Sequence, residues 1–391
     1  MHDDTKAIHL GRHPELHQGA VNPPLYRAST ILSESVAEWD AKRRDKANPD
    51  LVSYGVSGTV TKHWLQQALA ELEGGYRTAM FPSGLSACTL PILAYAGAGD
   101  HILVPDSVYF PTRRYCGQQL VKLRIEVTFY DPLIGAGIAA LLRPNTKLVF
   151  VESPGSLTFE IQDIPAIADI AHKHGALVMM DNTWGTPLYF KPFAHGVDVS
   201  LQATTKYICG HSDLIMGSVT TTEAAWGPLH TLVTDYGITT SPDDCWLAAR
   251  GLRTMPIRLR QHWATGLALG EWLMAQPEVE TVLHPAMPHD PGHALWKRDF
   301  GGACGLFAVV LKPMPVARMN AMLDALQLFG IGASWGGFES LAIPMNPADI
   351  RTATRWPHPG PCFRVHAGLE AANDLIADLK QGFAVMRASK S

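Results

Sequence analysis

The sequence predicts an α/β protein in which a mostly parallel central sheet is covered by helices and is followed by a smaller α+β C-terminal domain. Three runs, at residues 101–105, 147–152 and 176–180, have the length of strands and are apolar at nearly every position. Such runs indicate strands that are buried on both faces, as in parallel sheets with helices on each side. A helical segment between the last two runs completes a strand–helix–strand unit.

The first 58 residues are expected to form an N-terminal arm, which needs another surface to lie on. They are rich in Pro, Asn and Ser and show only weak periodicity. A helix is predicted at residues 61–73, where apolar side chains recur at helical spacing: Trp64, Leu65, Ala68, Leu69 and Leu72. Gly74 and Gly75 end this helix, because glycine readily adopts the backbone conformation of a helix C-terminus.

The helix of the strand–helix–strand unit has clear start and stop signals. Asp163 can cap its first turn, Pro165 lies inside that turn, and Gly175 stands just past its end. A further strand-like run at 197–205 follows the unit. The region up to Gly251 therefore predicts one large domain.

The pattern changes after Gly251. The later segments are a basic helix at 252–274, a loop rich in Pro and His at 284–293, a strand at 306–311, and helices at 317–328 and 369–386. We therefore divide the chain into the arm 1–58, a ligand-binding domain 59–251 and a C-terminal domain 252–391.

The charge distribution disfavours nucleic acid and membranes as partners. The 32 basic and 36 acidic residues give a formal net charge of −4, which provides no basic field for phosphate backbones or anionic lipids. The most apolar stretch, 87–98, is interrupted by Pro91 and falls short of the roughly 20 residues that span a bilayer. The chain starts Met-His-Asp-Asp, without the pattern of a signal peptide, so a cytoplasmic location is expected.

Neither a metal site nor a disulfide framework is expected. The cysteines show no C-x-x-C spacing and are predicted to be reduced packing residues: Cys88, Cys116, Cys209, Cys245, Cys304 and Cys362. His9, His13 and His17 have helical spacing, but Pro14 interrupts it and no carboxylate completes a ligand set.

Two polar residues follow predicted strands of the sheet. Ligands of open parallel sheets bind at the carboxyl ends of the strands, which is where Asp181 and Lys206 stand. Thr204 and Thr205 come directly before Lys206, and two hydroxyls beside an amine suit a phosphate group. Taken alone, however, such a lysine is usually a solvated charge and such an aspartate a cap or a member of a buried salt bridge.

Five short segments, in order, make the pattern specific: Tyr54-Gly55, then 81–87, 152–155, 181–184 and 204–207. Through them the chain resembles the Cys/Met-metabolism family of fold type I enzymes, which use pyridoxal 5′-phosphate (PLP). Within that family it is most similar to bacterial cystathionine β-lyases, through segments 131–135, 210–213, 250–254, 296–300 and 334–337. The likeness covers nearly the whole chain, so 59–251 becomes the expected PLP-binding domain.

The resemblance implies the catalytic residues. Lys206 would hold the cofactor covalently, and its freed amine would move the Cα proton of the substrate, a double use that suits a buried lysine. Asp181 would keep the pyridine nitrogen protonated through a charge-assisted hydrogen bond, so that the ring accepts the electrons of the Cα carbanion. Tyr109 matches the aromatic residue that stacks on the cofactor ring and is placed for proton transfer near the leaving sulfur.

The resemblance also implies the residues that bind the phosphate. Ser83, Gly84 and Leu85 form a turn before a helix and would offer backbone N–H groups, since helix N-termini favour anions. Thr204 and Thr205 would add their hydroxyls to the same phosphate.

At the substrate end, Arg364 matches the arginine that binds the α-carboxylate through two parallel hydrogen bonds. Ser334 and Trp335 stand where the family approaches that carboxylate. The expected ligand is therefore a small amino acid.

The family is built from dimers in which a Tyr-x-Arg segment reaches the neighbour's cofactor phosphate. Tyr54 is kept here, but Val56 stands in place of the arginine, and Ser57 replaces a second arginine that the β-lyases use for the distal end of cystathionine. Ala333 replaces a common aromatic residue. A homodimer as the catalytic unit, within a homotetramer, is expected, with a pocket that suits a less anionic distal group.

Three functions remain open from the sequence. The first is β-elimination from L-cystathionine or another cysteine S-conjugate, which yields a thiol such as homocysteine, pyruvate and ammonia in methionine metabolism and transsulfuration. The second is γ-replacement or γ-elimination on homoserine-type substrates; Ser156, where many γ-acting relatives carry asparagine, favours the first. The third is a dimer that senses the cofactor without turnover, which the retained Lys206, Asp181, Tyr109 and Arg364 disfavour.

Overall fold

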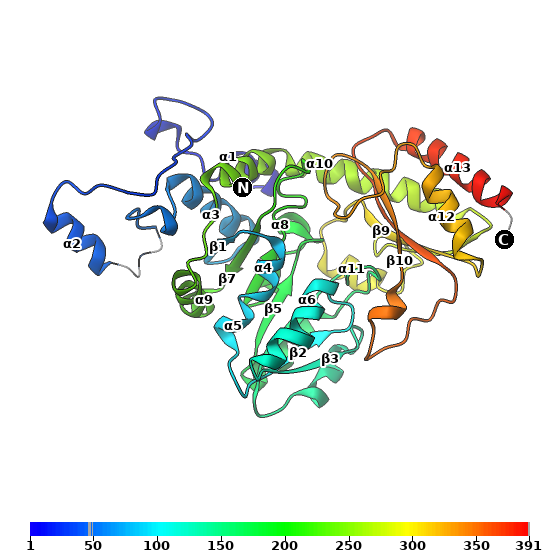
Figure 1. Ribbon diagram of the computed structural model, residues 1–391, viewed down its shortest axis with the longest axis horizontal. Coiled ribbons are helices and arrows are strands. Elements are labelled where there is room, and N and C mark those ends of the chain that lie inside the picture. Colours follow the sequence, from blue (N-terminus) through cyan, green and yellow to red (C-terminus); the bar gives the residue numbers. More distant parts are fainter. Residues whose placement is uncertain (46–47, 49, 390–391) are drawn as a thin grey trace.

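The computed structural model describes residues 1–45, 48 and 50–389. A seven-stranded sheet forms the large domain, in the order β1-β7-β6-β5-β4-β2-β3 (Figure 1). Its strands are β1 (Arg77–Phe81), β2 (His101–Pro105), β3 (Glu126–Tyr130), β4 (Thr146–Glu152), β5 (Leu177–Asp181), β6 (Val199–Gln202) and β7 (Gly217–Thr221). Neighbours from β3 to β6 run parallel, and β7 is antiparallel to β6 and β1. The prediction of a mostly parallel central sheet is confirmed.

The strands of this sheet are buried on both faces, as their sequence predicted. In β4, Val149 and Val151 belong to one core, and Leu148 and Phe150 belong to the other. The first core is covered by α3 (Val60–Glu73) and α7 (Ile164–His174). The second is covered by α4 (Gly84–Thr89), α5 (Ile92–Tyr95) and α9 (Glu223–Asp235). Since burying one such side chain contributes about 1.5–3 kcal/mol, both faces stabilise the sheet.

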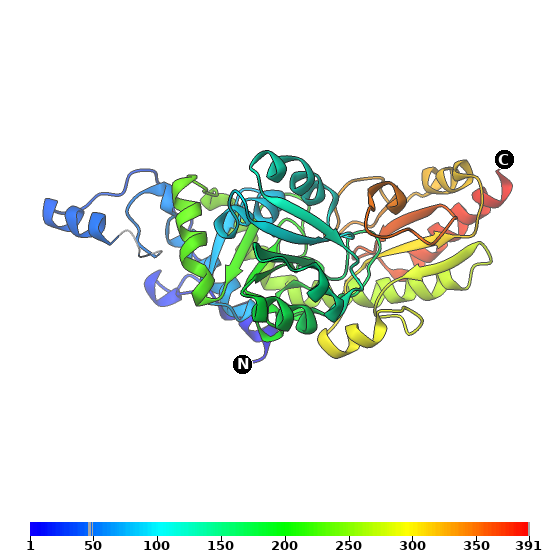
Figure 2. The ribbon, with the colours of Figure 1, turned by 90° about the horizontal axis from the view of Figure 1, so that it is seen from below.

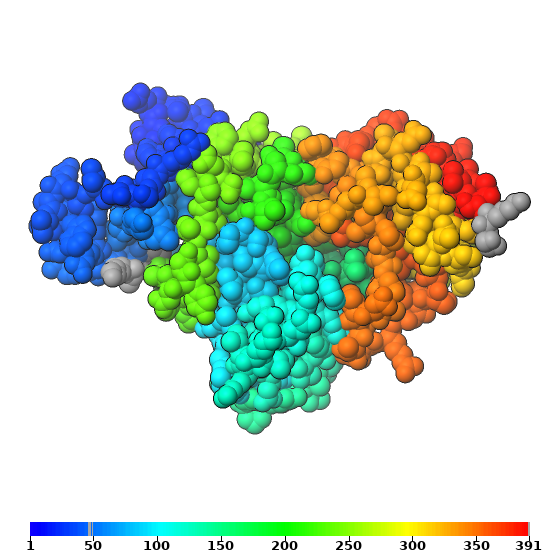
Figure 3. Space-filling model, in the orientation of Figure 1, coloured from blue at the N-terminus to red at the C-terminus, as the bar shows by residue number. Residues whose placement is uncertain are grey.

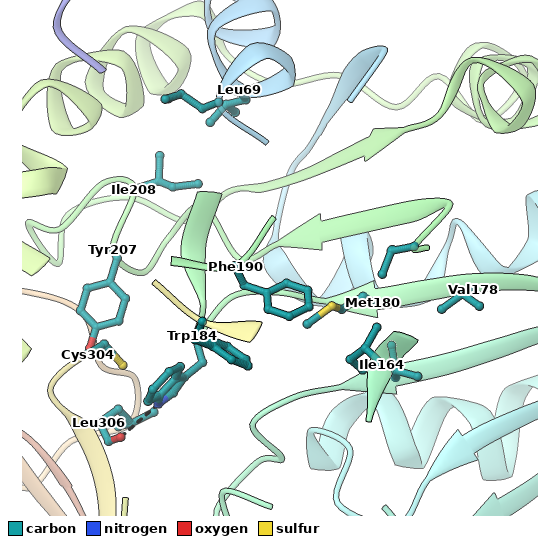
Figure 4. Close-up of a cluster of buried hydrophobic side chains, with 14 of the residues drawn as sticks. Leu69, Ile164, Val178, Met180, Trp184, Phe190, Tyr207, Ile208, Cys304 and Leu306 are labelled. Carbon is teal, nitrogen blue, oxygen red and sulfur yellow. Dashed lines mark hydrogen bonds between the residues drawn. The ribbon is translucent and has the colours of Figure 1, made fainter. Parts of the chain in front are cut away.

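The first core continues towards the C-terminal part of the chain. Figure 4 shows it, with Ile164, Val178 and Met180 on one side, Cys304 and Leu306 on the other, and Leu69 at the top. Trp184 lies between them and donates its indole N–H to the Leu306 carbonyl at 3.1 Å. Residues of the large sheet and of the C-terminal part thus belong to one continuous apolar cluster.

The predicted helix boundaries of the large domain agree with the structure. α3 ends at Gly74, which has a φ of +79°, in the left-handed region. α7 is capped by the side chain of Asp163, carries a proline in its first turn and ends at Gly175 with a φ of +82°. Two short helices, α6 (Phe110–Tyr115) and α8 (Thr186–Tyr189), follow β2 and β5 respectively.

The basic helix predicted at 252–274 is part of a longer one, α10 (Pro242–Met274). Ser241 caps its N-terminus, and Pro242 and Asp243 give the first turn the proline and acidic residue that favour a helix start. The boundary drawn between 251 and 252 therefore falls inside a helix, and the division into domains stays a prediction. α10 has 33 residues, but no helix of the described chain is apolar enough over sufficient length to cross a membrane.

The C-terminal part contains a second, four-stranded antiparallel sheet in the order β10-β11-β9-β8. Its elements are β8 (Val279–Leu283), α11 (His293–Asp299), β9 (Leu306–Leu311), α12 (Val316–Ala325), β10 (Leu341–Met345), β11 (Cys362–His366) and α13 (Ala372–Ala388). α12 and α13 were predicted with boundaries a few residues away. The smaller α+β domain is confirmed.

The N-terminal segment is more ordered than its weak periodicity suggested. α1 (Asp3–His9) lies on α10, where Arg253 donates to the carbonyls of Ala7 and Leu10. α2 (Val36–Arg44) buries no residue, and it projects away from the body of the molecule in both ribbon views (Figures 1 and 2) and as a lobe in Figure 3. Leu32 is 86% exposed, so this part of the arm leaves large apolar side chains in solvent.

Two of the N-terminal histidines and the six cysteines pack against other parts of the chain. His13 and His17 lie against the ring of Trp64, with centroid distances of 6.0 and 4.8 Å. The six cysteines are free and buried. This agrees with the packing role predicted for them.

A buried aspartate of the large domain forms hydrogen bonds to the C-terminal domain. Asp106 follows β2, is fully buried and pairs with Arg113 of α6 at 2.8 Å. It also accepts the N–H groups of Thr352, Ala353 and Thr354, in the loop between β10 and β11. Burial raises the pKa of Asp106, but these hydrogen bonds outweigh that effect and hold the pKa below its usual value. The carboxylate is therefore charged and saturated with donors.

We expect Asp106→Ala to lower the free energy of unfolding by about 3–5 kcal/mol, because it leaves a buried guanidinium and three N–H groups without an acceptor. Urea denaturation at pH 7 measures the loss. Asp169→Ala is the matched control, since its ion pair with Lys173 is exposed and contributes at most about 0.5 kcal/mol. A loss for Asp106→Ala that equals the control's would contradict this account.

Candidate active site

Polar side chains gather where the parallel strands end. Glu152 is the last residue of β4, Asp181 is the last residue of β5, and the two are register partners. The predicted strand at 197–205 is shorter, because β6 ends at Gln202 and a turn carries Lys206 beyond it. Since β4, β5 and β6 run in the same direction, all three side chains lie at one edge of the sheet.

The Lys206 amine is held by residues of the C-terminal domain. Its Nζ donates to the Ser334 hydroxyl at 2.6 Å and lies 5.3 Å from the centroid of the Trp335 ring. Burial and the positive charge of Arg364 lower the pKa of Lys206 to about 8, although the charge of Asp181 opposes them. A minority of the amine is thus uncharged at neutral pH, far more than for an ordinary lysine, as a nucleophile or base requires.

Asp181 is a buried carboxyl with a fixed orientation. Its Oδ1 accepts the N–H of Thr183 at 3.0 Å and the Thr183 hydroxyl at 2.6 Å, and its Oδ2 lies 3.5 Å from Cys88 Sγ. Burial raises the pKa of Asp181 despite these hydrogen bonds. Such a group favours a cationic N–H partner, because a neighbouring positive charge offsets the cost of burying the carboxylate.

The N-terminus of α4 offers donors for an anion. Ser83 caps this helix by exchanging hydrogen bonds with Ser86, whereas the N–H groups of Gly84 and Leu85 have no acceptor among residues the structure describes. A Cβ on Gly84 would come within 2.7 Å of the Ala203 side chain, so only glycine allows this close packing against the Lys206 turn.

The hydroxyls of the two predicted threonines are engaged elsewhere. Thr204 is fully buried and its hydroxyl donates to Ser218 at 3.2 Å. The Thr205 hydroxyl donates to the Met216 carbonyl and accepts the Met216 N–H. In this geometry the backbone N–H groups of α4 are free to bind an anion, whereas the phosphate role of Thr204 and Thr205 stays a prediction.

The substrate end is built by a strained loop against β11. Arg364 donates to the Ser334 carbonyl at 2.7 Å, and burial lowers the pKa of Arg364 to about 10. Ser334 has a φ of +93°, which costs a non-glycine residue of order 1–3 kcal/mol and is typical of functional sites. Gly336, with a φ of +86°, approaches the Lys206 backbone so closely that a Cβ would lie 3.0 Å from its carbonyl carbon. Ser334, Trp335, Arg364 and Lys206 are therefore brought together.

Tyr109 stands directly before α6 at the same edge. The residue is 44% exposed, and its N–H donates to Glu152 Oε2 at 2.7 Å. Burial raises the pKa of the phenol, and the nearby charge of Asp181 raises it further, although the positive charge of Arg364 opposes them. Tyr109 thus stands among the predicted site residues.

Tyr54 is separate from this group within the chain. It is 53% exposed, pairs with Thr30 in an isolated β-bridge, and makes no hydrogen bond to Lys206 or Asp181 in the described structure. Val56 is 40% exposed and Ala333 is also exposed. Whether a neighbouring subunit uses Tyr54 stays a prediction.

Glu152, Thr183 and Cys88 belong to the site but had no predicted role. Glu152 could have been found, because it ends an apolar strand just as Asp181 does. Thr183 and Cys88 carry no comparable signal, since their contacts with Asp181 depend on the local turn and on packing of α4.

The chemistry of these groups fits PLP. An amine of lowered pKa suits an aldehyde, a buried carboxyl suits a protonated pyridine nitrogen, and two free N–H groups beside a closely packed glycine suit a phosphate. The amine, the carboxyl and the N–H groups lie at the same edge of the mostly parallel sheet, which helices cover on both faces. Fold and site together define a PLP-dependent enzyme of fold type I.

Comparison with known proteins gives the family. The chain belongs to the Cys/Met metabolism PLP-dependent enzymes, whose family model matches residues 4–384. It is 47% identical to a putative cystathionine beta-lyase of Rhizobium johnstonii, over 98% of this chain and 96% of that protein. It is 42% identical to cystathionine beta-lyase MetC of Escherichia coli, over 97% and 98%. It is also 39% identical to an L-alanine/L-glutamate racemase of Wolbachia pipientis, over 98% and 97%.

Proposed function

We propose that this chain is a PLP-dependent carbon–sulfur β-lyase that cleaves L-cystathionine, or a related cysteine S-conjugate, to a thiol, pyruvate and ammonia. The main support for the proposal is that Lys206, Asp181 and Arg364 lie close enough to affect one another's charge at one site. The chain is also similar to cystathionine β-lyases over nearly its full length. Bound PLP would supply an electron sink for the carbanion at the substrate Cα.

Each side chain has a proposed task. Arg364 binds the substrate α-carboxylate, so that the Cα proton faces the Lys206 amine. That amine accepts the proton, which its lowered pKa permits near neutral pH. Asp181 would keep the ring nitrogen of bound PLP protonated, and Tyr109 would stack on the cofactor and assist proton transfer to the leaving sulfur.

The N–H groups of Gly84 and Leu85 would hold the phosphate, and Thr204 and Thr205 would add to this if their hydroxyls turned from Ser218 and Met216. Tyr54 of a neighbouring subunit completes the phosphate site in a homodimer, and two dimers form a tetramer. The projecting α2 with its exposed apolar residues supports such a contact. A cytoplasmic location and the division at residues 58 and 251 are part of the same proposal.

The distal end of the substrate is proposed to be less anionic than in typical cystathionine β-lyases. Val56, Ser57 and Ala333 supply neither a cation nor an aromatic ring where the resemblance implies them. Small or apolar thioether amino acids, such as S-alkyl cysteines, are therefore candidate substrates beside L-cystathionine.

Product analysis tests the reaction type. With L-cystathionine, β-cleavage releases homocysteine, pyruvate and ammonia, whereas γ-cleavage releases cysteine and 2-oxobutyrate. We expect pyruvate and homocysteine in equal amounts, measured by a coupled dehydrogenase assay and a thiol assay. Release of 2-oxobutyrate as the main keto acid would favour the γ-acting alternative. A panel of S-alkyl cysteines, assayed in the same way, ranks the distal groups.

A further inference from the structure

Two acidic side chains share the buried edge that carries Lys206. Glu152 and Asp181 end neighbouring parallel strands as register partners, so their side chains leave the sheet on the same face. They are only 8% and 9% exposed. Two buried carboxyls on directly paired strands do not both ionise readily, because a charge on one raises the free-energy cost of ionising the other.

The hydrogen-bond donors around the two carboxyls are unequal. Asp181 accepts from the Thr183 N–H, the Thr183 hydroxyl and the Cys88 thiol. The Glu152 carboxyl accepts the Tyr109 N–H at 2.7 Å, and no second donor lies within hydrogen-bonding distance of it among the described residues. Donors favour the charged form of the carboxyl that they contact. The negative charge of the pair therefore belongs on Asp181.

We infer that Glu152 is a positioning residue that stays protonated, anchors Tyr109 at the start of α6 and leaves the single negative charge of the pair on Asp181. Tyr109 has no side-chain cap of its own at this helix start, so the Glu152 contact fixes its backbone to the end of β4. The part that concerns Tyr109 rests on the proposed function, whereas the protonation of Glu152 does not.

The other titratable groups that face Glu152 agree with this assignment. Burial raises the pKa of Glu152 well above its usual value, and the charge of Asp181 raises it further. Burial likewise raises the pKa of the Cys88 thiol and of the Tyr109 phenol, so both are neutral near pH 7. None of these neighbours supplies a cation that would hold Glu152 ionised.

Infrared difference spectroscopy tests the inference directly. The spectrum of the wild-type holoenzyme minus that of Glu152→Gln at pH 7 should show the loss of a protonated carboxyl band. Glu160→Gln is the matched control, because Glu160 is paired with Arg351 at 2.5 Å and should lose an ionised carboxylate band instead. Loss of an ionised band in Glu152→Gln would overturn the inference.

Kinetics tests the positioning part. Glutamine keeps the acceptor for the Tyr109 N–H and is neutral, so kcat should stay within about 3-fold of wild type, and the pH titration of the cofactor absorbance should keep its midpoint. Glu152→Leu leaves the N–H without a partner and should lower kcat by about 10-fold or more. Equal losses in the Gln and Leu variants, or a shifted midpoint in the Gln variant, would overturn it.

The infrared measurement is repeated on cofactor-free protein. A failure of the proposed function would appear as absent borohydride labelling of Lys206 in the wild type. A failure of the present inference would appear only in the carboxyl bands of Glu152→Gln, so the two outcomes are distinguishable.

Discussion

Lys206→Ala is expected to lower kcat/KM by on the order of 10⁴–10⁶-fold, the range seen when a nucleophile that acts as a unit with its surroundings is removed. The variant loses both the amine that would attach the cofactor and the base that would move the Cα proton. Lys206→Arg should be about as inactive, because a guanidinium keeps the positive charge but does not give up its proton in a protein. The fold should survive both changes, since Lys206 contributes a hydrogen bond to Ser334 and little apolar burial.

Borohydride labelling checks this expectation independently of turnover. In the wild type, reduction should fix the cofactor to the peptide that contains Lys206, as mass spectrometry will show. Lys173→Ala is the control, because Lys173 is 73% exposed and should change neither labelling nor rate. Cofactor fixed to another lysine in the wild type, or more than about 1% of the wild-type rate in Lys206→Ala, would contradict the assignment.

The fold could be predicted to the extent that it depends on local patterns. β2, β4 and β5 are apolar on both faces, and α3 and α7 carry caps and glycine ends, so each was found with nearly correct boundaries. β1 and β7 were not identified. β7 reads Gly-Ser-Val-Thr-Thr, and its burial comes from pairing with β6 and β1 rather than from apolar composition. Context of this kind overrides propensity.

The residues of the site likewise differ in how far the sequence alone predicts them. Asp181 ends an apolar run and Lys206 follows a mixed one, and both were assigned to the site once the ordered segments showed the family resemblance, whereas their surroundings depend on tertiary contacts. Ser334 reaches the Lys206 amine across a sequence separation of 128 residues. Asp106 meets Thr352 across 246 residues. No local pattern encodes these pairs, because they form only when the C-terminal domain closes on the end of the large sheet.

Asp181→Asn is expected to lower kcat by about 100-fold while leaving the protein as stable as the wild type or more stable. A hydrogen bond to a charged group is worth about 1.5–3 kcal/mol, and an amide does not hold a pyridine nitrogen protonated as a carboxylate does. The electron sink for the Cα carbanion is then weaker. Stability should not fall, because the raised pKa of Asp181 means that its charged form is disfavoured by folding at neutral pH, and asparagine removes that cost.

A loss of activity without a loss of stability distinguishes a catalytic role of Asp181 from a structural one. Thermal unfolding and steady-state kinetics are measured on Asp181→Asn beside Asp163→Asn. The control keeps a good cap for α7 and loses only a partly exposed ion pair with Arg298, so its rate should not change and its stability should fall by at most about 1 kcal/mol. If Asp181 were needed chiefly for packing through Thr183, its variant would lose stability and rate together. If the rate falls while the melting temperature stays the same or rises, Asp181 lowers the stability of the protein but is needed for its activity. This is expected of a buried charge that binds a ligand.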